Sequence, residues 1–151
     1  MASPTPEPPE ARVATPHESA QSLMRLYELR REETMREARK WVTRSFNPTS
    51  VDDIAAIMQS EEYTYVRMTT SYWEMAASFV VHGAIDPEMF REVSGEMLVI
   101  YCKLEHMIDE VREHFGQPTL LKNVQAVADE WPGAQERMAS MREYFANAAQ
   151  S

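Results

Sequence analysis

Four side chains that can ligate metal ions follow one another at four-residue intervals in the C-terminal half of the chain. They are Cys102, His106, Glu110 and His114. Thiolate, imidazole and carboxylate groups are the ligands that zinc and related metals prefer. On one continuous helix this spacing places the four in a single column, because residues four apart lie one turn above another. The column makes His106, Glu110 and His114 candidates for a metal site, and hence for a metal-dependent enzyme.

A solvated helix face is the stronger interpretation of the same column. Four residues of helix rise about 6 Å, so the four ligands cannot all reach one ion. The column also lies opposite the apolar stripe Leu104, Ile108 and Val111, where a water-facing surface is expected. No histidine has a glutamate three positions before it, as di-metal helical bundles require. The chain also lacks Gly-x-Ser-x-Gly and phosphate-loop motifs. We therefore predict no metal, no cofactor and no catalytic residue.

A carboxylate stands inside another apolar stretch, where Glu74 follows Trp73. This side chain either projects into solvent or forms a semi-buried ion pair with Arg91 or Arg112. A buried ion pair more often makes packing specific than it catalyses a reaction. The sequence thus predicts a structural role for the group Glu74, Arg91 and Arg112.

Methionine is frequent, with 11 residues in the chain. Flexible methionine side chains fill gaps in a core, and they also line grooves that bind apolar ligands. Most of these residues fall on apolar stripes, so core filling is the favoured interpretation. The alternative is an apolar pocket between two central helices, whose predicted lining is Tyr72, Met75, Phe79, Met97, Tyr101 and Leu104.

Helices must hold all of these residues, because no segment alternates apolar and polar residues with a period of two. The most hydrophobic stretch, residues 72–108, predicts a helix that stops at Gly83, a restart capped by Asp86 with Pro87 in the first turn, and a second helix over 97–115. Around it we predict an all-α, single-domain bundle of five to six helices.

The first helix is predicted to be unusually long. Thr15, Pro16 and Glu18 match a capping box, and Asn47-Pro48 gives the stop, so the helix would run from about residue 15 to 45. Such a helix is about 45 Å long, and one end would overhang the domain. Residues 1–14, rich in proline and glutamate, are predicted to be a disordered tail, and residues 15–151 the helical domain.

Charge and composition narrow the class of partner. The 151 residues carry a net charge of -9. Residues 17–47 hold seven basic and five acidic side chains, whereas residues 48–151 hold seven basic and seventeen acidic ones. An acidic body predicts no nucleic-acid partner. The single cysteine, and the lack of a signal peptide or a run of ~20 apolar residues, predict a cytoplasmic protein without membrane spans.

The stretch 72–112 resembles a bacterial family of small helical proteins catalogued as a domain of unknown function. The resemblance lies in Trp73-Glu74, in Gly83-Ala84-Ile85-Asp86, and in the late arginine Arg112. It implies a helical fold and no established activity.

These patterns together predict a non-enzymatic helical interaction module that associates with itself, as a homodimer for example, or binds a protein partner. The alternative prediction is binding of an apolar small molecule in the pocket described above. A metal-dependent enzyme that uses the column on the central helix is the third hypothesis.

Overall fold

In the computed structural model, residues 3–4 and 13–151 are described, and every regular element in them is a helix. The predicted all-α class is confirmed, but these residues form more helices than the predicted five or six. Most of the predicted tail lies outside the described residues. The elements are α1 (Pro16–Arg30), α2 (Glu33–Ser45), α3 (Val51–Met58), α4 (Tyr63–Val81), α5 (Pro87–Val93), α6 (Glu96–Tyr101), the 3-10 helix η1 (Glu105–Met107), α7 (Ile108–His114), α8 (Lys122–Asp129) and α9 (Ala134–Ala148).

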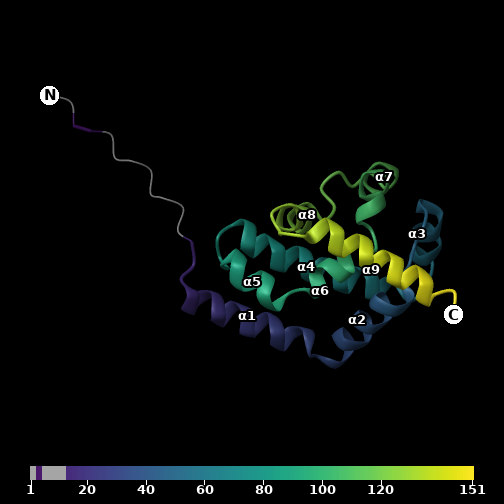
Figure 1. The fold of residues 1–151 in the computed structure, drawn as a ribbon, viewed down its shortest axis with the longest axis horizontal. Coiled ribbons are helices and arrows are strands. Elements are labelled where there is room, and N and C mark those ends of the chain that lie inside the picture. Colours follow the sequence, from purple (N-terminus) through teal and green to yellow (C-terminus); the bar gives the residue numbers. More distant parts are fainter. Residues whose placement is uncertain (1–2, 5–12) are drawn as a thin grey trace.

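The prediction of one long first helix is wrong, because the chain breaks between α1 and α2. The backbone of Glu32 leaves the helical region, with ψ of 142°, and its carboxylate accepts the N–H groups of Thr34 and Met35 at 3.1 and 3.0 Å. Glu32 therefore caps α2 instead of continuing α1. The break gives the two helices an open V shape (Figure 1), so the single helix of about 45 Å does not form. The capping box of Thr15 and Glu18 is present as predicted.

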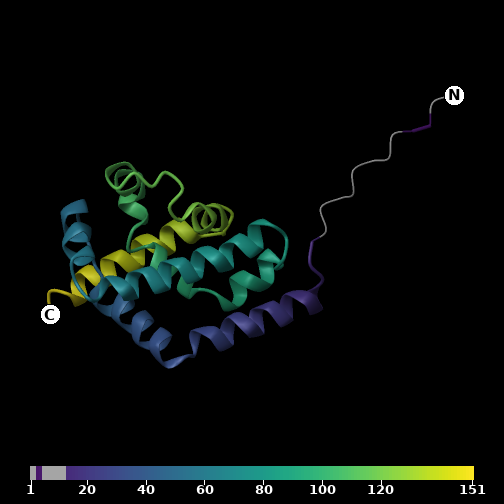
Figure 2. The ribbon, with the colours of Figure 1, turned by 180° about the vertical axis from the view of Figure 1, so that it is seen from behind.

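Helix α4 is the centre of the fold. It packs most extensively against α2 and α8. Helix α9 packs against α6; it crosses in front of α4 in Figure 1 and behind α4 in Figure 2. The large ring of Trp73 is 1% exposed, and burial of such a side chain contributes about 1.5–3 kcal/mol. The buried face of α4 consists of Val66, Thr69, Tyr72, Trp73, Ala76, Ala77 and Val80.

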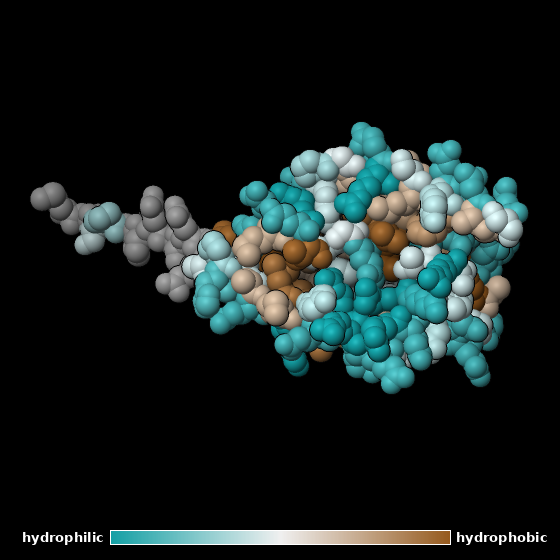
Figure 3. All heavy atoms as spheres, turned by 60° about the horizontal axis from the view of Figure 1, so that its bottom comes forward, coloured by the Kyte–Doolittle hydropathy of each residue, from teal (hydrophilic) through white to brown (hydrophobic). Residues whose placement is uncertain are grey.

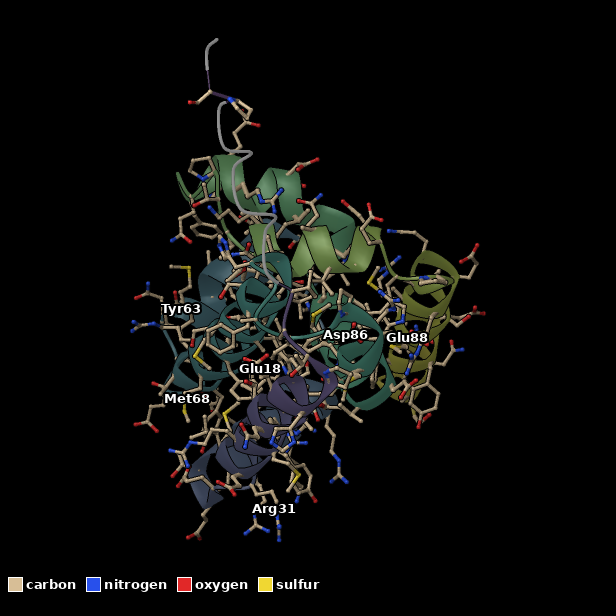
Figure 4. The ribbon with its side chains drawn as sticks, turned by 90° about the vertical axis from the view of Figure 1, so that its left-hand side faces the viewer. Glu18, Arg31, Tyr63, Met68, Asp86 and Glu88 are labelled. Atoms are coloured by element: carbon tan, nitrogen blue, oxygen red, sulfur yellow. The ribbon has the colours of Figure 1, made fainter. Side chains whose placement is uncertain are left out.

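The turn between α4 and α5 forms as predicted. Gly83 has a left-handed φ of 78°, and the Asp86 carboxylate accepts the N–H of Met89 at 2.8 Å. The backbone N–H of Asp86 donates to the hydroxyl of the buried Ser19 at 2.9 Å, which fixes α1 against the start of α5. In Figure 4, Glu88 in the first turn of α5 lies on the opposite side of the molecule from Met68 of α4.

The predicted continuous helix over 97–115 is also wrong. Helix α6 ends at Tyr101, where Lys103 and Leu104 form i−3 backbone bonds of 3.2 and 3.0 Å, and η1 and α7 follow in new directions. This change of direction carries Lys103 into the interior, where it is 3% exposed. No helix in the described part of the chain is long and apolar enough to cross a membrane.

Candidate functional site

The predicted metal-ligand column does not form, because the helix that would carry it is interrupted. His106, Glu110 and His114 are exposed, whereas Cys102 is fully buried, so its predicted place on the solvated face is wrong. The Cys102 thiol donates to the carbonyl of Val99 at 3.0 Å, and burial raises its pKa. Within residues 3–4 and 13–151, no three His, Cys, Asp or Glu side chains come together as metal ligands.

Glu74 accepts a hydrogen bond from the backbone of another helix and does not pair with an arginine. Its carboxylate accepts the backbone N–H of Asn123 in the first turn of α8, where the helix dipole favours a negative charge. Burial raises the pKa of Glu74, although this hydrogen bond opposes the rise. Arg112 donates through Nε and Nη2 to the carbonyl of Leu120 at 2.9 and 2.8 Å. Among the described residues, neither Arg112 nor Arg91 forms an ion pair with Glu74.

The six residues of the predicted apolar pocket are separated by the fold. Met75 and Phe79 are 38% and 37% exposed on the outer side of α4, apart from the buried remainder. The other four belong to the buried core: Tyr72, Met97, Tyr101 and Leu104.

A cavity of about 340 Å³ lies elsewhere, between the α2–α3 connection, the end of α6 and helix α9. Its volume falls within the range of ligand pockets. Its lining is Asn47, Pro48, Thr49, Cys102, Lys103, His106, Arg142, Phe145, Ala146, Ala149 and Gln150.

Lys103 lies at the inner side of this cavity without a carboxylate partner. Its Nζ donates to the carbonyl of Thr43 at 2.8 Å and to Oδ1 of Asn47 at 2.7 Å, and it lies 3.3 Å from the ring centroid of Phe145. These neutral acceptors hold the ammonium, but within the described part of the chain it has no ion pair. Burial lowers the pKa of Lys103 to about 8, so the side chain is still mostly a cation at pH 7.

Two further basic groups line the same cavity. Arg142 donates through Nη1 to Glu105 at 2.8 Å, and its Nε and Nη2 have no hydrogen bond to the described residues. His106 lies at the exposed side, and burial and the nearby Arg142 lower its pKa, so it is mainly neutral at pH 7. Glu105 neutralises Arg142, whereas no carboxylate among the described residues pairs with Lys103. The cavity therefore has a net positive charge.

The remaining walls of the cavity are mainly apolar, although Asn47, Thr49 and Gln150 also line it. Pro48 comes from the α2–α3 connection, and Phe145, Ala146 and Ala149 form one side of α9. A mainly apolar chamber with a few convergent polar groups is the usual form of a small-molecule site. The geometry therefore suits a ligand with an apolar body and a polar or charged end.

Sequence reasoning missed Lys103, Arg142 and Phe145. A signal was available for the lysine, which directly follows the apolar stretch 97–102 and precedes Leu104. A charged side chain within a segment that is apolar on all sides must reach a partner elsewhere in the fold. Arg142 and Phe145 gave no such signal, because the sequence of α9 is typical of an ordinary surface helix.

Comparison with known proteins identifies one family. The family described as "Domain of unknown function (DUF4760)" matches residues 16–131. The match agrees with the predicted resemblance to a domain of unknown function and extends well beyond residues 72–112. It covers α1 to α8 and ends before α9, which supplies Arg142 and Phe145. No curated protein and no solved structure matches the chain significantly.

Proposed function

The chain belongs to the DUF4760 family, a domain family of unknown function, and on its geometry we propose that it is a non-enzymatic module that binds a small molecule between α6 and α9. The single observation that carries this proposal is the cavity of about 340 Å³. Binding of an apolar small molecule was the alternative prediction from the sequence. The proposal keeps this function but places the site in the cavity beside α9, not between the two central helices.

The walls support binding rather than catalysis. The thiol of Cys102 is buried and its pKa is raised, which keeps it in the unreactive protonated form. Lys103 already donates to two neutral acceptors and faces an aromatic ring. A role in a bacterial cytoplasm remains a prediction from the sequence.

A titration with a neutral apolar fluorophore, N-phenyl-1-naphthylamine, tests the proposal. Ala146 lines the cavity and Ala139 on the same helix does not, although both are exposed, so the same substitution at each makes a matched pair. We expect saturable binding by the wild type, at least tenfold weaker binding by Ala146→Phe, and unchanged binding by Ala139→Phe. Absence of saturable binding, or equal effects of the two variants, would overturn the proposal.

Self-association is a second candidate function, supported by the surface of α1. Met24 and Tyr27 are 60% and 46% exposed, and the guanidinium groups of Arg30 and Arg31 each lie 5.4 Å from the Tyr27 ring centroid. Figure 4 shows Arg31 projecting away from the helices, and Figure 3 shows separate apolar patches ringed by hydrophilic side chains. Tyrosine and arginine are enriched where proteins associate, and a second copy offers the acidic body that this basic segment complements.

Sedimentation velocity at micromolar concentration and low salt tests this second candidate. We expect a concentration-dependent oligomer that dissociates in 0.5 M NaCl and in Tyr27→Glu, while Tyr144→Glu, at another exposed tyrosine, leaves it intact. A wild type that stays monomeric at all concentrations would exclude it.

A further inference from the structure

The residues that line the cavity beside α9 indicate which class of ligand it binds. The following inference rests on the proposed function, because it names the class of molecule that the same cavity takes. We propose that the ligand is a carboxylic acid whose carboxylate is bound by Arg142, with Lys103 supplying a second positive charge, and whose apolar body lies against Phe145 and the alanines of α9.

The first support is the unbalanced charge of the cavity. Lys103 is 3% exposed, and its hydrogen-bond partners, Thr43 and Asn47, are neutral. Taking a cation out of water is costly unless a negative charge compensates it. The chain has a net charge of -9, yet no acidic side chain in its described part forms an ion pair with this lysine. A ligand anion would supply the missing charge.

The second support is the geometry of Arg142. Glu105 takes only Nη1, which leaves the Nε and Nη2 donors on the other edge of the guanidinium. Two parallel donors on a planar group match the two oxygens of a carboxylate. The side chain is 28% exposed, so a ligand that enters the cavity can reach these donors.

The third support is the number of donors, which favours a carboxylate over a phosphate. A phosphate dianion needs several converging donors, such as a row of backbone N–H groups or a second arginine. The hydroxyl of Thr49, which lines the cavity, already donates to Asp53 at 3.0 Å. Of the other polar side chains that line the cavity, Asn47 and Gln150 are neutral amides, and His106 has a lowered pKa and is mainly neutral.

Isothermal titration at pH 7 with matched probes tests the inference. The probes are 2-naphthoate, its neutral analogue 2-naphthamide and 2-naphthyl phosphate, which share one apolar body. We expect the wild type to bind 2-naphthoate at least tenfold more tightly than the amide, and more tightly than the phosphate. Arg142→Met should reduce the preference for the acid over the amide to threefold or less.

Arg137→Met is the matched control, since Arg137 is exposed on the same helix and does not line the cavity. It should leave the preference unchanged, and Lys103→Met, where it folds, should reduce the preference as Arg142→Met does. Equal binding of acid and amide by the wild type would overturn the inference and leave the proposed function standing. Tighter binding of the phosphate would overturn the choice of carboxylate. Absence of binding by all three probes would count against both the inference and the proposed function.

Discussion

The Nζ atom of Lys103 lies 3.3 Å from the ring centroid of Phe145, so an ammonium buried at the end of α6 contacts the last helix of the chain. This contact is a cation–π interaction in a site largely shielded from water, where such pairs reach about 2 kcal/mol. It joins two elements that share the wall of the cavity. It also explains how a lysine without a carboxylate partner is held in place.

Replacing the ring should loosen α9. We expect Phe145→Leu to lower the free energy of unfolding by about 1–2 kcal/mol, because the aliphatic side chain keeps part of the apolar contact but loses the ring. Urea denaturation measures this change. Tyr144→Leu is the control, since Tyr144 is 68% exposed, and it should change stability by about 0.5 kcal/mol or less. Equal losses in the two variants would contradict the assigned contact.

The lowered pKa of Lys103 predicts a dependence of stability on alkaline pH. The folded-state pKa is about 8 and the unfolded one about 10.5, so between these values the unfolded chain binds more protons and stability rises with pH. Over pH 8 to 10 the rise is about 2 kcal/mol at most. The series stops at pH 10 because burial raises the pKa values of Tyr72 and Tyr101, which oppose the rise at higher pH.

The Lys103→Met variant isolates this contribution. Urea denaturation at pH 7, 8, 9 and 10 should give a wild-type curve that rises relative to that of the variant. Cys102, whose raised pKa acts in the opposite direction near pH 9, is present in both proteins. The charge of Lys103 lowers the Cys102 pKa, so its removal raises that pKa further and increases the difference between the two curves in the same direction. Parallel curves would show that Lys103 titrates normally.

Glu74 is predicted to act as the cap of a distant helix. Glu74→Ala should cost about 1–2 kcal/mol, because the N–H of Asn123 loses its acceptor in a partly buried place. Glu74→Gln should cost less, since an amide oxygen still accepts and the desolvated charge is gone. Chemical denaturation at pH 7 compares the two. If the two variants lowered the free energy of unfolding equally, the charge of Glu74 rather than its hydrogen bond would be its main contribution to stability.

The pair Arg39 and Glu96 should couple α2 to α6. Nε of Arg39 donates to Glu96 at 2.7 Å, Nη2 donates to the second oxygen of the same carboxylate, and Nη1 donates to the carbonyl of Arg30 at 2.8 Å. Both side chains are about one-quarter exposed, so water screens the pair only in part. A double-mutant cycle with Arg39→Met and Glu96→Gln should give a coupling of about 1 kcal/mol. A coupling indistinguishable from zero would show that the pair is only a surface contact.

Local sequence determined where most helices begin and end. The capping box at Thr15, the glycine stop at Gly83 and the Asp86-Pro87 restart all form as predicted, because each depends on residues three or four positions away. Residues 30–34 carry no apolar side chain, which leaves a gap in the apolar stripe of the predicted first helix. Its outcome, a break capped by Glu32, was not predicted because the capping-box and apolar patterns on both sides favour one continuous helix.

Only the tertiary structure decided the candidate site. Lys103 is buried because an acceptor 60 residues earlier, the Thr43 carbonyl, and the ring of Phe145 on α9 converge on it. The sequence alone placed its neighbour Cys102 on a solvated face, since a regular helix through this region would put it there. Helix periodicity describes neighbours on one helix, whereas a cavity is made by residues that meet from three separate elements. The sequence by itself therefore determined the helical class and its caps, and long-range packing decided which charged side chain lies inside.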